Sequence, residues 1–515
     1  MNRYDRSIVA SGHQLVSEAA GTILDAGGNA FDAVVAAGFA SAVAEPALTS
    51  LGGGGFMVGH SEATGRDMVF DFFVDTPGRG REGDVFKPDF FKITVDFGGS
   101  LQDFNIGLGS VAVPGTLKGL LHIHKRLGRM KLNDIIAPAR EIALHHRVNE
   151  HMGHFLKLLH PIMTLTERGR RIYQPGGRLL RAGDTLESGE LAGFLDQLSA
   201  EGAESFYFGE IAREIDREMK SGGGLLTAKD LAAYQVKESK PLAIPYREQV
   251  FLTVPEPSMG GTLIGLSLAL MAEQPSRDYV WGSAEHLLDT VGLMREVESL
   301  RQAGVTTPEA LRQFLHNQSL LTESTRRMRL FSRGTTHVSV ADRSGNCAGM
   351  TCSNGEGAGY FAPGTGVMLN NMMGEDDLHP QGFHAGQPGE RVFSMMSPSL
   401  LLQEGHVRLV LGSGGSKRIR TAVSQVLSQV VDFNRSLQQA VDAPRLYLDE
   451  DCLQLEPGFA EEAVAAVKNE LPVNLWPQKD VYFGGVHAVI PGVEGAGDPR
   501  RGGSVVTVYH NEKGR

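Results

Sequence analysis

The sequence contains few cysteines, no long hydrophobic run and no block of basic residues. Cysteine occurs only at Cys347, Cys352 and Cys452 among 515 residues, which excludes a disulfide scaffold and a zinc site made of four thiolates. The longest apolar stretch, residues 33–44, is too short to span a bilayer. Acidic side chains outnumber basic ones by 60 to 49, which argues against nucleic acid as the main partner. We therefore expect neither a nucleic-acid nor a membrane partner.

The N-terminal residues MNRYDRSIVASGHQ hold no uncharged hydrophobic region after Arg6, so they predict no signal peptide and a cytoplasmic location. Hydrophobic residues make up 41% of the chain, which is enough for a large core. Glycine, with 64 residues, is clustered between apolar runs and indicates many tight turns and close backbone approaches. Nothing in the sequence indicates the oligomeric state.

The spacing of apolar residues predicts helices alternating with strands. Residues 14–44 have helical spacing that breaks at Gly27-Gly28, and Asn29 is placed to cap the second helix, with Asp32 in its first turn. Further helices are expected at 116–128, 130–160, 205–220, 258–330 and, capped by a serine, 417–433; strands are expected at 56–60, 68–75, 240–254, 336–353 and 406–412. Two packed sheets with helices outside would fit this order.

The sequence lacks the motifs of three common kinds of site. His151 and His154 lie in EHMGH, which lacks the His-Glu-x-x-His zinc pattern, so we interpret the histidines of 145–160 as a solvated helix face. The glycine run at 52–55 lacks the Gly-Lys-Ser/Thr ending of a phosphate loop. The segment at 412–416 is not a Gly-x-Ser-x-Gly elbow. The sequence therefore predicts no metal site and no cofactor.

The segment Gly334-Thr335-Thr336-His337 could supply a nucleophile. An alcohol needs a base close to it, and the α-amino group of a chain end, with a pKa of about 7.7–8.0, suits that role near neutral pH. Thr335 gains such an amine only if the Gly334–Thr335 bond is cut, and its own hydroxyl could make the cut through an ester. On this segment alone, an ordinary β-branched strand start is the simpler interpretation.

Blocks throughout the chain resemble the γ-glutamyltranspeptidase family, in the family's order. The first are SEAAGTILDAGGNAFDAVVAA, EPALTSLGGGGFMV and VAVPGTLKGLLHIHKRLGR. The middle blocks are FYFGEIAREI, GGGLLTAKDLAAY, PEPSMGGT and TTHVSVADRSGN, and the last are VMLNN, SMMSPSL, GSGGS and GDPRRGG. The resemblance covers nearly the whole sequence.

The resemblance implies an α+β fold, the four-layer αββα sandwich of N-terminal-nucleophile hydrolases. It also implies autocleavage between Gly334 and Thr335, into a large-subunit region 1–334 and a small-subunit region 335–515 that stay associated in one intertwined fold. Thr335 would then be the nucleophile, with its α-amine as base. Ser353 matches a supporting hydroxyl, with Thr351 beside it on the same strand face, and Gly414 and Gly415 match the glycines of the oxyanion hole.

The positions that would read the substrate depart from the family pattern. Phe73 stands where the family has the arginine that binds the glutamyl α-carboxylate, and Arg79 and Arg81 are the next arginines along the chain. Glu375 matches the acidic residue that takes the α-amino group. A serine pair is reduced to Ser394, with methionine following it, and Asn354 lies beside the glycine that replaces an asparagine contact.

Three hypotheses follow. The first is an autoprocessing threonine enzyme that cleaves γ-glutamyl amides such as glutathione and passes the acyl group to water or an amine acceptor. The second keeps this machinery but changes the acyl group, because Phe72, Phe73 and Met395 favour a less polar acyl portion. The third is an unprocessed, non-catalytic homologue.

Overall fold

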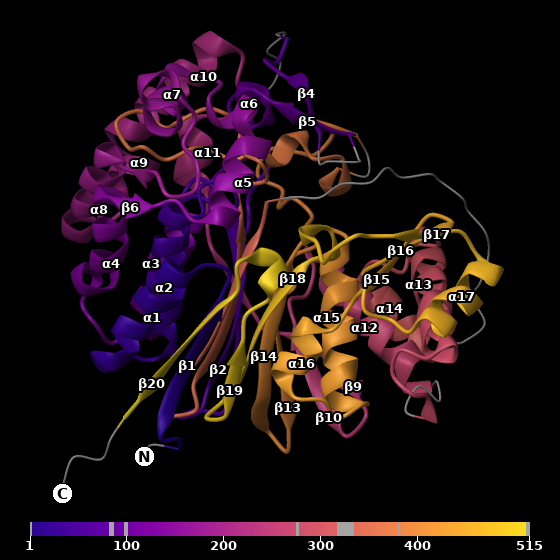
Figure 1. The fold of residues 1–515 in the computed structure, drawn as a ribbon. Coiled ribbons are helices and arrows are strands. Elements are labelled where there is room, and N and C mark those ends of the chain that lie inside the picture. Colours follow the sequence, from indigo (N-terminus) through magenta and orange to yellow (C-terminus); the bar gives the residue numbers. More distant parts are fainter. Residues whose placement is uncertain are drawn as a thin grey trace, which may run out of the picture.

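Two β-sheets lie face to face at the centre of the molecule, and helices cover the outer face of each (Figure 1). The computed structural model describes residues 3–81, 87–96, 101–273, 278–316, 334–379 and 382–510. The first sheet consists, in spatial order, of β20 (Ser504–Tyr509), β1 (Arg6–Ser11), β11 (Thr336–Ala341), β12 (Cys347–Ser353), β2 (Gly54–Ser61), β3 (Arg66–Phe72) and β8 (Lys237–Ser239). The second consists of β19 (Glu494–Ala496), β18 (Gly485–Ile490), β14 (His406–Gly414), β13 (Ser399–Gln403), β10 (Gln249–Thr253) and β9 (Leu242–Tyr246). The predicted four-layer αββα arrangement is confirmed.

Separate groups of helices cover the two sheets. The first sheet packs against α1 (Gln14–Asp25), α2 (Ala30–Ala44) and α3 (Thr116–Leu127), with α4 (Leu132–Leu144) behind them. The second packs against α12 (Met259–Glu273), α15 (Arg418–Val431) and α16 (Leu437–Asp442). The α2 helix begins as predicted, because Asn29 and Asp32 form a capping box, and all of its 15 residues are buried, many of them alanine. Such small side chains let it lie close to the sheet.

The remaining elements lie around this sandwich (Figure 1). Beyond the first helical layer are α5 (Glu150–Leu158), α6 (His160–Met163), α7 (Glu167–Tyr173), α8 (Gly189–Glu201), α9 (Glu204–Tyr207), α10 (Glu210–Gly222) and α11 (Ala228–Ala233), with the short ribbons β4 (Phe91–Asp96), β5 (Leu101–Ile106), β6 (His146–Arg147) and β7 (Thr185–Leu186). Beside the second layer are α13 (Ala284–Gln302), α14 (Pro308–His316), α17 (Glu461–Glu470), β15 (Leu446–Asp449), β16 (Cys452–Leu455) and β17 (Val473–Leu475).

Both sheets contain strands from each side of residue 334. The central strands β11 and β12 of the first sheet follow that residue, whereas β1, β2, β3 and β8 precede it. In the second sheet, β9 and β10 precede it and the other strands follow it. Neither part could therefore keep its sheets without the other. The part of the predicted 258–330 helical region that falls at 317–333 lies outside the described residues.

One predicted cap is wrong. The α15 helix has Lys417 at its N-cap and no side-chain hydrogen bond there, because the preceding Ser416 has a positive φ of 53° and its hydroxyl donates to Asp377 at 3.2 Å. Ser416 is thereby turned away from the helix. Within the ranges that the structure describes, no helix is long and apolar enough to cross a membrane.

Candidate active site

Thr335 lies at the end of the central strand β11, where the ends of both sheets meet. The antiparallel register pairs Thr336 with Cys352, which brings Ser353 level with Thr335 on the neighbouring strand. From the second sheet, β14 ends at Gly414 beside Thr335. Three strand ends thus place a threonine, a serine and a glycine turn together, and Thr335 is only 4% exposed.

The peptide between Gly334 and Thr335 is held on its carbonyl side by the end of β12. The Ser353 hydroxyl donates to the Gly334 carbonyl at 2.5 Å and accepts from the Gly355 N–H at 3.0 Å. The Gly334 N–H donates to the buried Glu356 carboxyl at 3.4 Å. A Cβ at residue 334 would lie 2.5 Å from the Gly355 carbonyl oxygen, so only glycine fits before Thr335.

The carbonyl of Thr335 is held by a residue that the sequence analysis did not single out. Arg501 donates from Nη1 to the Thr335 oxygen at 3.1 Å and is buried. A Cβ at Gly414 would meet both this oxygen and the Arg501 guanidinium, and Gly415 has a φ of 125°, so both positions of the turn require glycine. The GDPRRGG block was the only sequence signal for Arg501.

A buried carboxyl lies on the other side of β11, the strand that Thr335 precedes. Glu45, at the C-terminal end of α2, accepts the Thr336 hydroxyl at 3.0 Å. Burial raises the pKa of Glu45 to about 7, against the smaller opposing effects of Thr336 and Arg501. Burial also lowers the pKa of Arg501 to about 10. The two groups beside Thr335 and Thr336 therefore titrate closer to neutral pH than usual.

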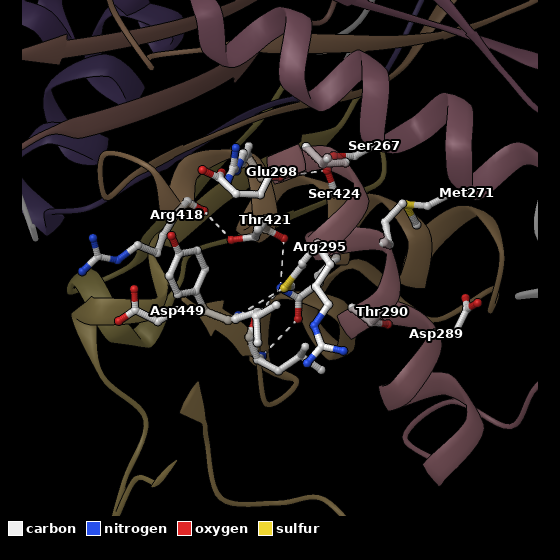
Figure 2. A pocket seen from close by; sticks show the side chains of 18 of the residues that line it. Ser267, Met271, Asp289, Thr290, Arg295, Glu298, Arg418, Thr421, Ser424 and Asp449 are labelled. Atoms are coloured by element: carbon white, nitrogen blue, oxygen red, sulfur yellow. Dashed lines mark hydrogen bonds and ion pairs between the residues drawn. The ribbon is translucent and has the colours of Figure 1, made fainter. Parts of the chain in front are cut away.

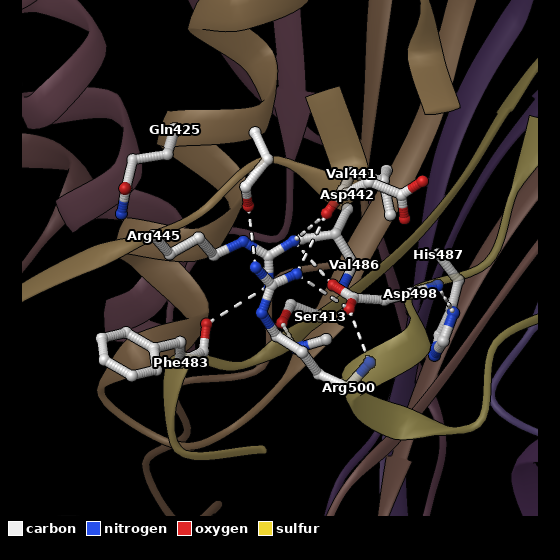
Figure 3. A network of polar contacts seen from close by, with 12 residues as sticks. Ser413, Gln425, Val441, Asp442, Arg445, Phe483, Val486, His487, Asp498 and Arg500 are labelled. Carbon is white, nitrogen blue, oxygen red and sulfur yellow. Dashed lines mark hydrogen bonds and ion pairs between the residues drawn. The ribbon is translucent and has the colours of Figure 1, made fainter. Parts of the chain in front are cut away.

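An ion-paired network fixes the turn that carries Arg501 (Figure 3). Asp498 accepts Arg445 at 2.6 Å, Arg500 at 3.1 Å and the Val486 N–H at 2.8 Å. Burial alone would raise the pKa of Asp498, but the two arginines hold it at about 2. Arg500 also donates to Glu456 at 2.7 Å. Removing one member of such a buried network costs about 3–5 kcal/mol, so the position of Arg501 is firmly set.

Next to Thr335 lies a small cavity of about 30 Å³. Its polar lining residues are Thr335, Ser353, Glu375, Ser394 and Ser416, and its apolar ones are Phe73, Met372, Leu378, Met395, Met396 and Ile419. Four of the predicted site residues therefore meet around one space: Thr335, Ser353, Glu375 and Ser394. No arginine or lysine is among the described residues that line it.

Two of the predicted site residues, Thr351 and Asn354, do not line the cavity. Thr351 is bound to Nδ1 of the buried His337 at 2.7 Å and does not line the cavity. Asn354 also lies outside the lining; both polar atoms of its buried side chain have no hydrogen-bond partner among the described residues.

The arginines near Phe73 are engaged away from the cavity. Arg391 donates to the Phe73 carbonyl and pairs with Asp71 at 3.2 Å and Asp75 at 3.1 Å. Arg81 donates to the Gly224 carbonyl at 2.7 Å, and Arg79 packs against Gly389. The Phe73 ring instead stacks on Phe56, with centroids 5.5 Å apart.

The histidine-rich segment is less solvated than predicted. His146 is 7% exposed and donates from Nδ1 to the Ile142 carbonyl of α4 at 2.9 Å, and burial lowers the pKa of His151 to about 4. Among the residues that the structure describes, no three His, Cys, Asp or Glu side chains are grouped so that they could hold a metal ion.

Comparison with known proteins identifies the family. The family model described as gamma-glutamyltranspeptidase matches residues 16–508. The chain belongs to the γ-glutamyltranspeptidase family. Among curated members, it is 32% identical to the acylase ACY 1 proenzyme of Pseudomonas sp. (strain SE83), over 90% of this chain and 86% of that protein. It is 31% identical to the glutathione hydrolase proenzyme of Escherichia coli (strain K12), over 90% and 84%.

A solved structure supports the same fold. The cephalosporin acylase from Bacillus halodurans superposes with a TM-score of 0.82 at 23% identity, over 98% of this chain and 96% of that one. The γ-glutamyltranspeptidase family thus includes both glutathione hydrolases and acylases among the relatives of this chain, and it consists of N-terminal-nucleophile hydrolases. The protein is an enzyme of this family.

Proposed function

We propose that the protein is an autoprocessing amide hydrolase that uses Thr335 as its nucleophile and prefers an acyl group with an amino group but no carboxylate. The observation that carries the substrate class is the lining of the Thr335 cavity. It combines one acidic side chain with six apolar ones and has no arginine or lysine among the described residues. Both relatives named above are proenzymes, which supports maturation by cleavage.

The scission step would begin from the contacts at Gly334. Thr335 Oγ attacks the Gly334 carbonyl carbon, while Ser353, already donating to its oxygen at 2.5 Å, stabilises the charge that develops there. The hydroxyl proton passes to the peptide nitrogen as the C–N bond breaks, and water hydrolyses the resulting ester. The products are a carboxylate on Gly334 and a free amine on Thr335, and the fragments 1–334 and 335–515 stay together through their shared sheets.

In turnover, the substrate's acyl group takes the place that the Gly334 acyl group leaves. This vacated space adds to the cavity of about 30 Å³. The new α-amine accepts the Thr335 hydroxyl proton and passes it to the departing amine, and the N–H groups of the Gly414–Gly415 turn receive the oxyanion. Water or an amine acceptor then releases the acyl group from the ester.

The acyl preference follows from charge. Glu375 would pair with an ammonium group on the acyl chain, whereas an acyl carboxylate would enter an apolar, acid-lined space whose described residues include no cation. The second candidate is a γ-glutamyl hydrolase or transferase that acts on compounds such as glutathione. Within the cavity only Glu375 favours it, and outside the cavity the name of the E. coli relative does.

Four p-nitroanilides separate these candidates because they differ only in two groups. They carry the γ-glutamyl, 4-aminobutyryl, glutaryl and butyryl acyl groups: amine and carboxylate, amine only, carboxylate only, and neither. We expect kcat/KM to be highest for 4-aminobutyryl and lowest for glutaryl. A γ-glutamyl compound turned over at least about tenfold faster than 4-aminobutyryl would instead establish the second candidate.

The third possibility, an unprocessed non-catalytic homologue, is tested by intact mass. The full chain has a mass of 55.5 kDa. We expect two fragments that separate at Gly334–Thr335 under denaturing conditions and co-elute under native ones. A single full-length species after long incubation, with no turnover of any of the four anilides, would contradict the proposal.

A further inference from the structure

A second and much larger cavity, of about 420 Å³, lies between the helices of the second sheet's outer layer and the elements beside that layer (Figure 2). Its walls come from α13, α15, the end of α12 and the β15–β16 ribbon. It shares no lining residue with the Thr335 cavity, although both use the same segment: Ser416 and Ile419 line the first, and Lys417 and Arg418 line the second. Its size is typical of small-molecule sites.

One face of α15 contributes polar side chains to the cavity. Thr421, Ser424, Gln425 and Ser428 recur at helical spacing, and Ser267 of α12 also lines the space. The opposite walls contribute apolar and aromatic groups, among them Met271, Trp281, Tyr447 and Phe459.

Five hydroxyl groups that line this cavity donate their protons to protein oxygens. Ser424 donates to the Arg420 carbonyl at 2.8 Å, Ser267 to that of Leu263 at 2.9 Å, and Ser428 to the Asp432 carboxylate at 2.8 Å. Thr421 and Thr290 likewise donate to helix carbonyls. Since a hydroxyl has one proton and two lone pairs, these groups face a ligand as hydrogen-bond acceptors.

Gln429 adds a stronger acceptor. Its side chain is 3% exposed and lines the cavity, and its Oε1 has no hydrogen-bond partner among the described residues. A buried amide oxygen without a partner is costly, and a ligand donor would remove that cost. The uncharged polar groups of the cavity therefore favour a ligand that carries an N–H donor.

The charged side chains of the cavity also favour a ligand with a positive charge. The inner cations are engaged by the protein: Lys417 with Asp377 at 3.3 Å, Arg420 with Glu298 at 2.8 Å, and Arg418 with the Tyr482 carbonyl at 3.1 Å. Asp289, partly buried, has no ion-pair partner within the described ranges, and burial raises its pKa. The exposed charged residues in the described lining are two acids, Glu450 and Asp451, and one base, Arg295.

We propose that this cavity is a second binding site, separate from the Thr335 cavity, for a primary amine with an aromatic or branched apolar body. The ammonium group would donate to Gln429 Oε1 and the hydroxyl lone pairs and be balanced by Asp289, while the body packs against Trp281, Phe459 and Met271. Trp281 lies 5.7 Å from Phe459 between ring centroids, which makes an aromatic wall at one end.

The sequence provides a reporter for this site, since it has two tryptophans and only Trp281 lines the cavity. In a Trp476→Phe protein, fluorescence then reports on the cavity alone. The probes are 2-phenylethylamine, 2-phenylethanol and phenylacetate, which share a body and differ in head group. We expect a saturable change with the amine, with Kd at least about tenfold lower than for the alcohol or the acid.

Variants locate the binding. Ser424→Phe fills the cavity and should abolish the signal, and Gln429→Leu should raise the amine's Kd about five- to tenfold while leaving the alcohol's Kd nearly unchanged. The Thr335→Ala form should bind as tightly as its parent, since the catalytic cavity is not involved. No saturable change with any probe, or phenylacetate binding as tightly as the amine, would overturn the proposal. If Ser424→Phe does not fold, the Gln429→Leu result decides.

Discussion

The two ends of the Thr335 cavity differ in how they are built. At the reaction end, the peptide around Thr335 is held by Ser353 on one carbonyl and Arg501 on the next, and glycines at 414 and 415 allow the close approach. At the acyl end, Phe73 and three methionines line the space, and Glu375 is the one acidic side chain in the described lining. The sequence predicts that Thr335 and the glycine turn at the reaction end follow the family's pattern and that Phe73 at the acyl end departs from it, so we expect chemistry and specificity to be separable here.

The largest effect is expected from removing the nucleophile. Thr335→Ala deletes the only oxygen proposed to attack, so processing should stop and turnover should fall by at least about 10³-fold. Denaturing electrophoresis and anilide turnover measure both. Ser353→Ala is the graded control: it should slow scission and turnover more mildly, because the nucleophile remains. Normal processing in the Thr335→Ala protein would refute the assignment of the reaction end.

Arg501→Gln should have the next largest effect. In the proposed processed enzyme, Arg501 still donates to the Thr335 carbonyl and so positions this residue. Misplacing a reacting group by about 1 Å costs about 10²-fold in rate. Loss of a nearby positive charge should also raise the pKa of the α-amine by about one unit, which moves the acid limb of the kcat/KM profile to higher pH.

The same profile tests a purely structural role. The carboxyl groups of Glu45, Glu356 and Glu375 remain in this variant, but loss of Arg501 also raises the pKa of Glu45, in the same direction as that of the α-amine. Arg217→Gln, at an exposed arginine of α10, is the matched control and should leave the profile unmoved. A slower Arg501→Gln enzyme with an unshifted acid limb would mean that Arg501 acts through folding alone.

At the acyl end, Phe73→Arg should change selectivity rather than chemistry. An arginine there could pair with an acyl carboxylate, so the ratio of γ-glutamyl to 4-aminobutyryl turnover should rise about tenfold or more. Phe73→Leu controls for loss of the ring that stacks on Phe56. A processed, folded Phe73→Arg enzyme with the parent's ratio would show that this position does not read the carboxylate.

The last expected effect concerns stability and leaves the proposed chemistry unchanged. Because the pKa of Glu45 is raised from 4.5 to about 7, its protonated form is favoured by folding, and stability falls as pH rises from about 4.5 to 7. This shift of about 2.5 units corresponds to at most about 3 kcal/mol. Between pH 5 and 8 the Tm of Glu45→Gln should therefore fall less than the Tm of the parent protein. A Glu190→Gln control, on the exposed face of α8, should show the same fall as the parent. Equal slopes would contradict the raised pKa.

Local sequence patterns predicted much of the fold. The Asn29 and Asp32 cap, the Thr335 strand and the GSGGS turn each depend on residues close together in the chain, and the family resemblance supplied the layer order. Arg501 could not be placed, because its contact with Thr335 spans 166 residues and has no periodicity. The serine cap of α15 failed for a similar reason, since Asp377 competes for the hydroxyl of Ser416 from a distant loop.

The turn at residues 499–501 ties Thr335 to a segment 166 residues away in the chain. The guanidinium that fixes the Thr335 carbonyl, and the strand β20 that borders β1, both come after residue 498. We expect a chain cut before residue 499 to keep Thr335 but to lose the donor to its carbonyl, so the proposed scission should not occur in it.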